Sequence, residues 1–430
     1  MKHLAWILVL LASVCILLSP GSQAQVVSQD FEKDPLNPAF AGGGPGTWDE
    51  TVLAPMVLYN PDSARYEMWY TGWLGGRANG IGFAVSTDGL TWERISTEPV
   101  LQPTPGAWDS LVALGGWVIR ENGQYKMWYT GGSSTLSNGF PHHIGYAVSP
   151  DGIQWTKHAG PVLSPGTQTW EASSVAYCCV IPGGNGYTMF YTGETSANAR
   201  IGRAFSADGI SWERDTSNNP VLTGGPSGSW DRNAYLPRVV RDNDHLDMFY
   251  TAEPVPRGGA SKIGGAKSTD EGRTWVKDTL NPLLDLGASG EWDMNAVELG
   301  SVLLEGGMFQ MWFDGEKYLP LFGARVGTSW ARSTAVLEEW PVPTGFVLDQ
   351  NYPNPFNPVT KIRFTIVDRR LTIVSVHDLL GQEVATLVNE VKDPGTYEVV
   401  FDASGLASGV YLYRLTAGDY VQARRLILIR

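Results

Sequence analysis

Along this chain, five pairs of a tryptophan followed by an acidic residue stand in one regular series, at steps of 60, 62, 60 and 62 residues. A regular spacing of this length indicates five copies of one structural unit, each large enough for several strands joined by tight turns. The five pairs are Trp48-Asp49, Trp108-Asp109, Trp170-Glu171, Trp230-Asp231 and Trp292-Asp293.

Each copy contains the same strand signals in the same order. About twenty residues after the Trp-acid pair comes an aromatic strand, then a strand of small residues, then a turn that contains Asp and Gly and is closed by Trp. The aromatic strands are centred on Trp69, Trp128, Phe190, Phe249 and Trp312, and the turn carboxylates are Asp88, Asp151, Asp208 and Asp270. An Asp in a tight turn accepts backbone N–H bonds, so we expect these four carboxylates to be structural.

Four strands per copy and five copies predict an all-β fold, a five-bladed β-propeller over residues 25–336. The fifth copy lacks the last turn and its Trp. Residues 31–38 near the N-terminus resemble residues 275–282, which follow the turn of the fourth copy. We therefore expect the N-terminus to supply the outer strand of the fifth blade, which would close the ring without an unpaired edge.

The two ends of the chain have different compositions. Residues 1–24 have basic residues, an apolar run and a small-x-small site, which predicts a secretory signal peptide. After a linker at residues 337–346, residues 347–430 alternate apolar and polar residues in short strands bounded by Gly, which predicts a small immunoglobulin-like β-sandwich.

The charge balance excludes several partners. Lys and Arg number 31 against 44 acidic residues, a formal charge of −13, so nucleic acid is not expected as a ligand. No run after the signal reaches the length of a membrane span, so the mature chain is predicted to have no transmembrane segment.

Cys178 and Cys179 are the two cysteines left after processing. They are either two small buried residues or a strained vicinal disulfide, and the sequence leaves both interpretations open.

The C-terminal region carries the motifs of a known family. Its opening Asn351-Tyr352-Pro353-Asn354-Pro355, with residues 378–381 and Gly409-Val410-Tyr411, resembles the C-terminal sorting domain of type IX secretion. The resemblance implies recognition by the type IX machinery, and a secreted or outer-membrane surface-attached protein. A carbohydrate-binding sandwich is the alternative, although this region shows no aromatic platform.

Residues 31–333 resemble the five-bladed glycoside hydrolases of families 43 and 32, in which acids on successive blades hydrolyse glycosidic bonds. The resemblance implies a carbohydrate substrate, with Asp49 as general base, Asp109 as modulator of the acid's pKa, and Glu171 as general acid. Carboxyl groups suit this reaction because one must be ionised while another keeps its proton. The chain lacks the Asp-Pro junction of family 43 at this point, so Glu50 is an alternative base.

A second interpretation covers all five Trp-acid pairs without chemistry. Because the pair also recurs in the fourth and fifth copies, Trp can wedge between blades while the acid caps a local turn. The protein would then be a non-catalytic surface propeller that binds glycans or proteins.

Further candidates for substrate binding come from loops expected on the same rim as the Trp-acid pairs. Trp73 and Trp117 fall outside the phase of the repeat and are candidates for stacking on a sugar ring. Glu316 follows the fifth aromatic strand on this rim. The remaining candidates are Glu50, Arg77, His142, His143, Glu194, Asp231, Arg238, Glu253 and Asp293. No zinc, phosphate or dinucleotide motif is found, so no cofactor is expected, and a structural calcium ion on the axis stays open.

Overall fold

In a computed structural model, the chain divides into two compact units, residues 1–335 and 336–430. The structure describes residues 31–134, 142–255, 259–318, 323–332, 346–351, 353–367, 369–379, 381–392, 395–418 and 420–429. The predicted signal peptide and nearly all of the predicted linker lie outside these residues. Within them, strands dominate, and one 3-10 turn, η1 (Thr169–Glu171), is present.

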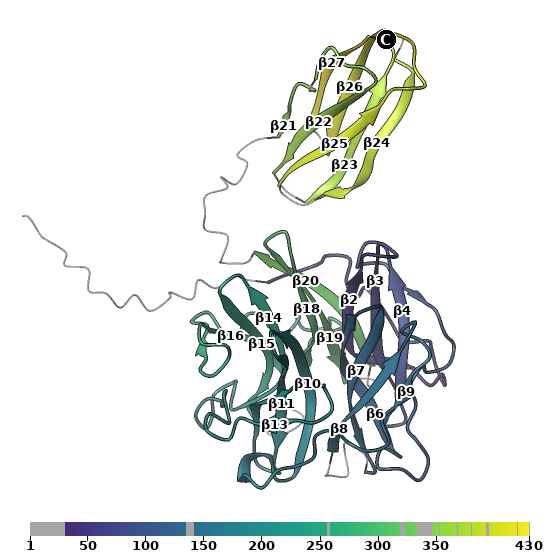
Figure 1. The fold of residues 1–430 in the computed structure, drawn as a ribbon. Coiled ribbons are helices and arrows are strands. Elements are labelled where there is room, and N and C mark those ends of the chain that lie inside the picture. The colour runs from purple at the N-terminus through teal and green to yellow at the C-terminus, as the bar shows by residue number, and fades with distance from the viewer. Residues whose placement is uncertain are drawn as a thin grey trace, which may run out of the picture. The chain divides into compact units, whose positions relative to one another are not determined.

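The first unit contains five antiparallel four-stranded sheets (Figure 1), one for each copy of the repeat. Sheet 1 holds β2 (Thr51–Asn60), β3 (Arg65–Leu74), β4 (Arg77–Ser86) and β5 (Glu93–Arg94). Sheet 2 holds β6 (Val112–Glu121), β7 (Gln124–Gly132), β8 (His142–Ser149) and β9 (Thr156–Lys157). Sheet 3 holds β10 (Ser174–Gly183), β11 (Gly186–Glu194), β12 (Ala199–Ser206) and β13 (Glu213–Arg214). Sheet 4 holds β14 (Asn233–Asp242), β15 (His245–Glu253), β16 (Lys262–Ser268) and β17 (Val276–Lys277).

Sheet 5 is assembled from both ends of the unit. Its strands β18 (Ala296–Glu305), β19 (Met308–Lys317) and β20 (Gly323–Arg332) are completed by β1 (Glu32–Lys33). Glu32 lies opposite Trp330 in the antiparallel pair. The expectation that the N-terminus supplies the outer strand of the fifth sheet is confirmed.

The first strands of the five sheets neighbour one another in a closed ring, in the order β2, β6, β10, β14, β18 and back to β2. Each of these inner strands has a bulge that disturbs its register with the second strand. At each bulge a backbone N–H donates to a side chain on the second strand of the preceding sheet. In four cases the acceptor is a threonine hydroxyl: Thr71, Thr130, Thr192 and Thr251, at 2.7–2.9 Å.

The aromatic strands fill the space between sheets. The Trp69 indole donates to the carbonyl oxygen of Gly152 in the turn of sheet 2, at 2.8 Å. Trp128 and Trp312 make the equivalent bonds to Gly209 of sheet 3 and Gly89 of sheet 1. These three rings are almost entirely buried. Each turn is thus a docking point for the neighbouring sheet, and the bond from Trp312 links the last sheet to the first.

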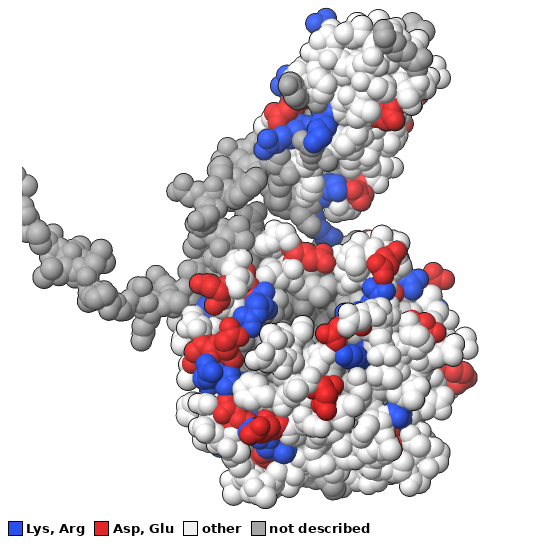
Figure 2. All heavy atoms as spheres, viewed as in Figure 1, with Lys and Arg blue, Asp and Glu red and all other residues white. Residues whose placement is uncertain are grey.

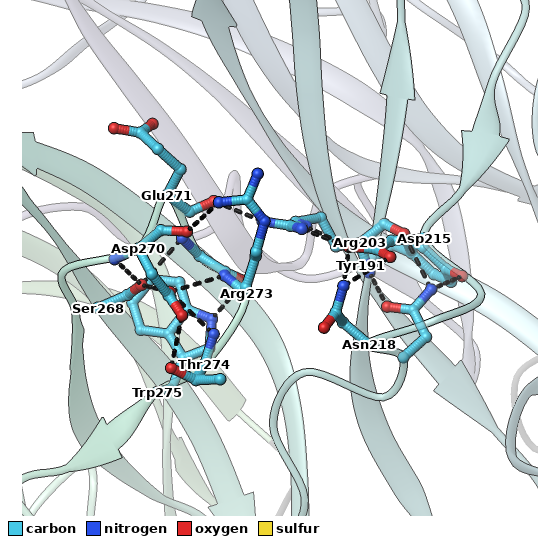
Figure 3. Close-up of polar contacts among 12 residues, drawn as sticks. Tyr191, Arg203, Asp215, Asn218, Ser268, Asp270, Glu271, Arg273, Thr274 and Trp275 are labelled. Carbon is cyan, nitrogen blue, oxygen red and sulfur yellow. Dashed lines mark hydrogen bonds and ion pairs between the residues drawn. The ribbon is translucent and has the colours of Figure 1, made fainter.

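The turn carboxylates have the structural role expected from the sequence. Asp208 Oδ1 accepts the N–H groups of Ile210 and Ser211 at 2.8 and 2.7 Å, which holds the pKa of this carboxyl below its usual range. Asp270 does the same with Arg273 and Thr274 (Figure 3).

The same close-up shows a second link between sheets 3 and 4. The buried Arg203 guanidinium forms an ion pair with Asp215 and donates to the carbonyl oxygen of Glu271 at 2.5 Å (Figure 3). A charged group of sheet 3 thereby holds the turn of sheet 4 in place.

The second unit is built from two sheets. One contains β21 (Val347–Leu348), β22 (Val359–Ile366) and β25 (Gly395–Asp402), and the other contains β24 (Glu383–Lys392), β23 (Arg370–His377), β26 (Gly409–Ala417) and β27 (Tyr420–Leu428). Its core includes Phe364, Val374, Tyr413 and Leu426. No helix among the described residues of the chain is long and apolar enough to cross a membrane.

Candidate functional site

The five acids of the Trp-acid pairs each form an ion pair within their own sheet. The cation comes from the outermost strand every time, and all five acids are buried. The pairs are Asp49 with Arg94 (2.8 Å), Asp109 with Lys157 (2.5 Å), Glu171 with Arg214 (3.0 Å), Asp231 with Lys277 (2.6 Å) and Asp293 with Lys33 (2.6 Å). One arrangement repeated five times indicates a scaffold role.

This arrangement differs from the expected convergence of Asp49, Asp109 and Glu171. A tyrosine of the second strand donates to each carboxylate: Tyr70 at 3.1 Å, Tyr129 at 3.0 Å and Tyr191 at 2.8 Å. Every one of the three acids is therefore bound to the second and outermost strands of its own sheet. The physical reason is that a buried carboxylate needs a cation, and the repeat supplies one locally. The geometry favours the scaffold interpretation, and Asp231 and Asp293 share the ion pair with the outermost strand.

The sequence repeat is broken at the ring centre by one residue of the fifth sheet. Asp314 occupies the position that Thr71, Thr130, Thr192 and Thr251 hold in the other four sheets. Its Oδ1 accepts the N–H of Ala54 at 2.8 Å, so it closes the fifth bulge as the threonines close theirs. Its Oδ2 is buried without a hydrogen-bond partner among the described residues. Asp314 thus preserves the bond of the repeat and adds a carboxyl group.

Two further carboxyl groups lie beside Asp314. Glu298, on the inner strand β18, is directly opposite Asp314 in the antiparallel register. Glu316 lies on the same strand as Asp314, two residues later and therefore on the same face. Carboxylate oxygens of the three residues all lie within 4.8 Å of one another; Asp314 is buried, and Glu298 and Glu316 are partly exposed. We call this group the axial carboxyl cluster.

The pKa values of the three carboxyl groups in the axial carboxyl cluster are raised. Burial raises the pKa of Asp314 well above its usual range, and the charges of Glu298 and Glu316 add to this effect. Burial and the charge of Glu298 raise the pKa of Glu316 to about 8. Three carboxyl groups this close cannot all be ionised at low cost, so the cluster holds at least one proton near neutral pH.

Glu298 is the member best stabilised as an anion. The Tyr235 hydroxyl, on β14, donates to Glu298 Oε1 at 2.7 Å, and the Ser261 hydroxyl lies 3.3 Å from the same oxygen. These bonds lower its pKa, although burial raises it more. Both hydroxyl groups bind the same carboxylate oxygen, Oε1.

Most of the other candidates from the sequence lie near the ring but in different roles. Glu253 ends β15 and accepts the N–H of Gly259 at 3.2 Å, and its charge acts on Glu316, so it belongs to the surroundings of the cluster. Glu50 is exposed and accepts the N–H of Gly46 in its own turn. Glu194 is buried at the end of β11. Arg77 begins β4, and its side chain is outside the described part of the structure.

The paired histidines are buried or half-buried. His142 is fully buried, and its Nδ1 lies 3.3 Å from Ser174 Oγ. His143 Nδ1 lies 3.0 Å from Ser164 Oγ, and burial lowers the pKa of this imidazole. The prediction that they bind substrate is not supported by these contacts.

Arg238 and Trp117 have a different role from the predicted contact with substrate. The fully buried Arg238 guanidinium donates to the carbonyl oxygens of Gly300 on β18 and Cys178 on β10. It also lies 5.4 Å from the centre of the Trp117 ring on β6. Arg238 therefore connects four inner strands. Cys178 and Cys179 beside it are free, buried thiols, and burial raises the pKa of both to about 12.

Two groups among the described residues have the spacing of metal ligands. One is the axial carboxyl cluster, and the other is Asp242, His245 and Asp247 at the β14–β15 turn. In the second group His245 Nε2 lies 3.0 Å from Asp247, and Lys267 lies 3.9 Å from the same carboxylate, so ion pairs account for its charges.

Figure 2 shows that acidic and basic side chains are interspersed on the face viewed.

Comparison with known families identifies the second unit. Residues 350–429 match the family described as secretion system C-terminal sorting domain. The second unit is a sorting domain. The protein is thus exported by type IX secretion and is secreted or attached to the cell surface.

The first unit resembles solved structures of propeller-type glycoside hydrolases. A structure described as a glycoside hydrolase has a TM-score of 0.57 at 19% identity, over 70% of this chain and 92% of that protein. A thermostable family-43 glycoside hydrolase has 0.52 at 18%, over 68% and 91%. A glycoside hydrolase from the GH130 family of mannoside phosphorylases has 0.54 at 15%, over 71% and 94%. These likenesses show the fold.

Curated relatives are also found. Uncharacterized protein MT1551 of Mycobacterium tuberculosis (strain CDC 1551 / Oshkosh) is 29% identical over 232 residues, which is 52% of this chain and 75% of that protein. Uncharacterized protein Rv1502 of Mycobacterium tuberculosis (strain ATCC 25618 / H37Rv) is 28% identical over the same shares.

Sequence reasoning missed the central members of the site. Glu298 and Asp314 were not among the candidates, and Glu316 was placed on the rim without a role. The signal was present in the repeat: Asp314 stands where four copies have Thr, and Glu298 stands where the others have Leu53, Leu114, Ala176 and Tyr235. A departure from a structural repeat at the ring centre is a stronger indication of function than the repeated residue itself.

Proposed function

We propose that this protein is an exported glycoside hydrolase whose chemistry takes place at the axial carboxyl cluster. In this proposal the five sheets are the blades of a five-bladed β-propeller, and the second unit is an immunoglobulin-like sandwich that the secretion machinery recognises. The observation that carries the proposal is the replacement of the repeated Thr by Asp314, with Glu298 and Glu316 beside it.

The roles follow from exposure and proton affinity. Glu316 is partly exposed and has a pKa of about 8, so it carries a proton at neutral pH and acts as general acid on the leaving oxygen. Glu298 is partly exposed and stabilised as an anion by two hydroxyl groups, so it acts as base toward water. Asp314 is fully buried between them and does not reach substrate; it sets the charge and orientation of the other two.

Glycosidic bond hydrolysis suits such a group. It requires one carboxyl group that keeps its proton and another that is ionised, in one site, and the positive charge that develops on the sugar is stabilised by nearby carboxylates. The likeness to propeller-type glycoside hydrolases supports the same reaction. A propeller that binds glycans or proteins without catalysis is the alternative, and the scaffold role of the Trp-acid pairs favours it at those residues.

The test is hydrolysis of a panel of arabinan, xylan, fructan and mannan oligosaccharides, followed by release of reducing ends. We expect activity in the wild type and a loss of about 100-fold or more in Glu316→Gln and Glu298→Gln. Asp314→Thr restores the residue of the other four sheets and keeps the bond to Ala54, so its loss of activity cannot be attributed to a broken bulge. Glu50→Gln, an exposed acid on the same rim, is the matched control and keeps full activity.

The same panel tests the sequence-based assignment. If Glu171→Gln abolishes hydrolysis while Glu316→Gln does not, the catalytic acids are those of the first three sheets. If the wild type is inert on the whole panel but retains oligosaccharides, the non-catalytic function holds.

A further inference from the structure

The wall of the ring centre away from the carboxyl groups is aromatic and apolar. Trp73, at the end of β3, and Tyr177, in the bulge of β10, both pack against one small cluster of buried residues. That cluster contains Val112 and Leu114 of the inner strand β6, together with Ala78. Trp73 and Tyr177 are themselves only partly buried. Two partly exposed aromatic rings therefore share one apolar support at the start of the inner strands.

Tyr177 occupies a backbone position that an aromatic residue rarely adopts. Its φ is +47°, and the matching bulge residues of sheets 1 and 4, Ala54 and Leu236, have φ values of +48° and +55°. The matching residue of sheet 2, Gly115, is not in this left-handed region, and a Cβ added there would lie 2.7 Å from the Cβ of Ala54. A bulky side chain with positive φ costs about 1–3 kcal/mol and persists where the surroundings impose it. The bond from the Tyr177 N–H to Thr130, at 2.9 Å, imposes it here.

The aromatic wall continues to the axial carboxyl cluster. The Tyr177 ring lies 6.4 Å from the ring of Tyr235, and Tyr235 donates to Glu298. Aromatic rings thus come from sheets 1, 3 and 4, and the carboxyl groups of the cluster come from sheet 5, with Glu253 of sheet 4 beside them. Sugar rings have this division too, with C–H groups on one face and hydroxyl groups at the edge, and aromatic faces suit the C–H groups.

The charge of the site restricts the sugar. Beside burial, the charges of Glu298 and Glu316 raise the pKa of Asp314, and the charges of Glu298 and Glu253 raise the pKa of Glu316. A uronic acid or sulfated sugar bound between Tyr177 and Glu298 would bring a further negative charge into this group. Like charges juxtaposed in a poorly hydrated site cost several kcal/mol, so anionic sugars are disfavoured.

We propose that Trp73 and Tyr177 form a binding platform for the apolar face of a neutral sugar ring, which is held with its scissile bond toward Glu298 and Glu316. The orientation of the sugar rests on the proposed function, whereas binding of the sugar to Trp73 and Tyr177 does not require catalysis. Trp117, the other stacking candidate from the sequence, packs against Arg238 instead.

The test measures binding separately from hydrolysis. Neutral arabino-, xylo-, manno- and fructo-oligosaccharides and anionic oligogalacturonides are titrated into full-length Glu316→Gln by calorimetry. We expect at least one neutral series to bind and oligogalacturonides to bind at least tenfold more weakly. Adding Trp73→Ala or Tyr177→Gly to this background should weaken neutral binding about tenfold each. Glycine adopts a positive φ without steric cost, so Tyr177→Gly retains the backbone of the bulge.

Tyr177→Phe and Trp73→Phe are the matched controls, since they keep a ring, and binding should change less than threefold. Circular dichroism and the melting temperature show that each variant is folded. Equal affinity in Tyr177→Gly and its parent, or preferential binding of oligogalacturonides, would overturn the platform. If neutral sugars bind and the ring variants lose them, but wild type hydrolyses nothing, the platform stands and the proposed hydrolase function fails.

Discussion

The raised pKa of Glu316 makes a prediction that requires no substrate. Burial and the charge of Glu298 move this pKa from 4.5 to about 8. The folded state therefore binds the proton more tightly than the unfolded chain, and the free energy of unfolding should fall as the pH rises from about 4.5 to about 8. A shift of this size corresponds to at most about 5 kcal/mol. Because Glu298 and Asp314 share protons with Glu316, we expect about 2–3 kcal/mol.

Glu316→Gln removes this titration, so the variant should gain stability relative to wild type as the pH rises. The free energy of unfolding is measured by urea denaturation, with tryptophan fluorescence, at several pH values between about 5 and 8. The quantity that matters is the difference between variant and wild type at each pH, because the carboxylates outside the axial carboxyl cluster affect both proteins equally. Glu50→Gln serves as the exposed control and should follow wild type. Parallel curves for Glu316→Gln and wild type would refute the proton-sharing cluster.

Three further predictions concern the scaffold. Lys157→Met leaves the buried Asp109 without its cation and should lower the free energy of unfolding by roughly 3 kcal/mol, measured by urea denaturation, while the folded fraction keeps its ligand binding. Asp208→Ala removes two bonds to backbone N–H groups and should cost about 1–2 kcal/mol, with a loss that shrinks at low pH as the wild-type carboxylate gains its proton. Removal of residues 336–430 should leave the melting temperature of the first unit within about 2 °C of its value in the full chain, because the first unit has its own core. Calorimetry measures both transitions. A larger drop would show that the sorting domain stabilises the first unit.

The sequence predicted the architecture of the first unit because its repeat is enforced in every copy. The Trp-acid pair, the aromatic strand and the Asp-containing turn each have a bonding partner in the same or the next sheet, such as Trp69 with Gly152. Where the same hydrogen bond recurs from copy to copy, the residue that makes it also recurs in the sequence. The similarity of residues 31–38 to residues 275–282 even revealed which strand closes sheet 5, since both segments pair with the third strand of a sheet.

The site was not predicted for the same physical reason. Residues that recur in every copy belong to the scaffold. Asp49, Asp109 and Glu171, whose positions suggested a catalytic set, each form an ion pair with a cation of their own sheet. Glu298 and Asp314 become neighbours only through the register of β18 with β19, and a one-residue change in the bulge would separate their side chains onto opposite faces. The burial that raises the pKa values of Glu298 and Asp314 depends on closure of the ring of inner strands, which no local sequence pattern predicts.

Closure of sheet 5 by β1 has a consequence for export. The axial carboxyl cluster lies entirely on β18 and β19, and the sheet that holds these strands is completed by β1, which stands at the opposite end of the first unit's sequence. Until β18 and β19 have packed against β2, Ala54 has no Asp314 to receive its N–H, and the three acids are separate, solvated carboxylates with ordinary proton affinities. Under the proposed function, a chain that has not yet folded therefore has no group able to act on a glycan, and the chemistry arises only when sheet 5 has taken its place.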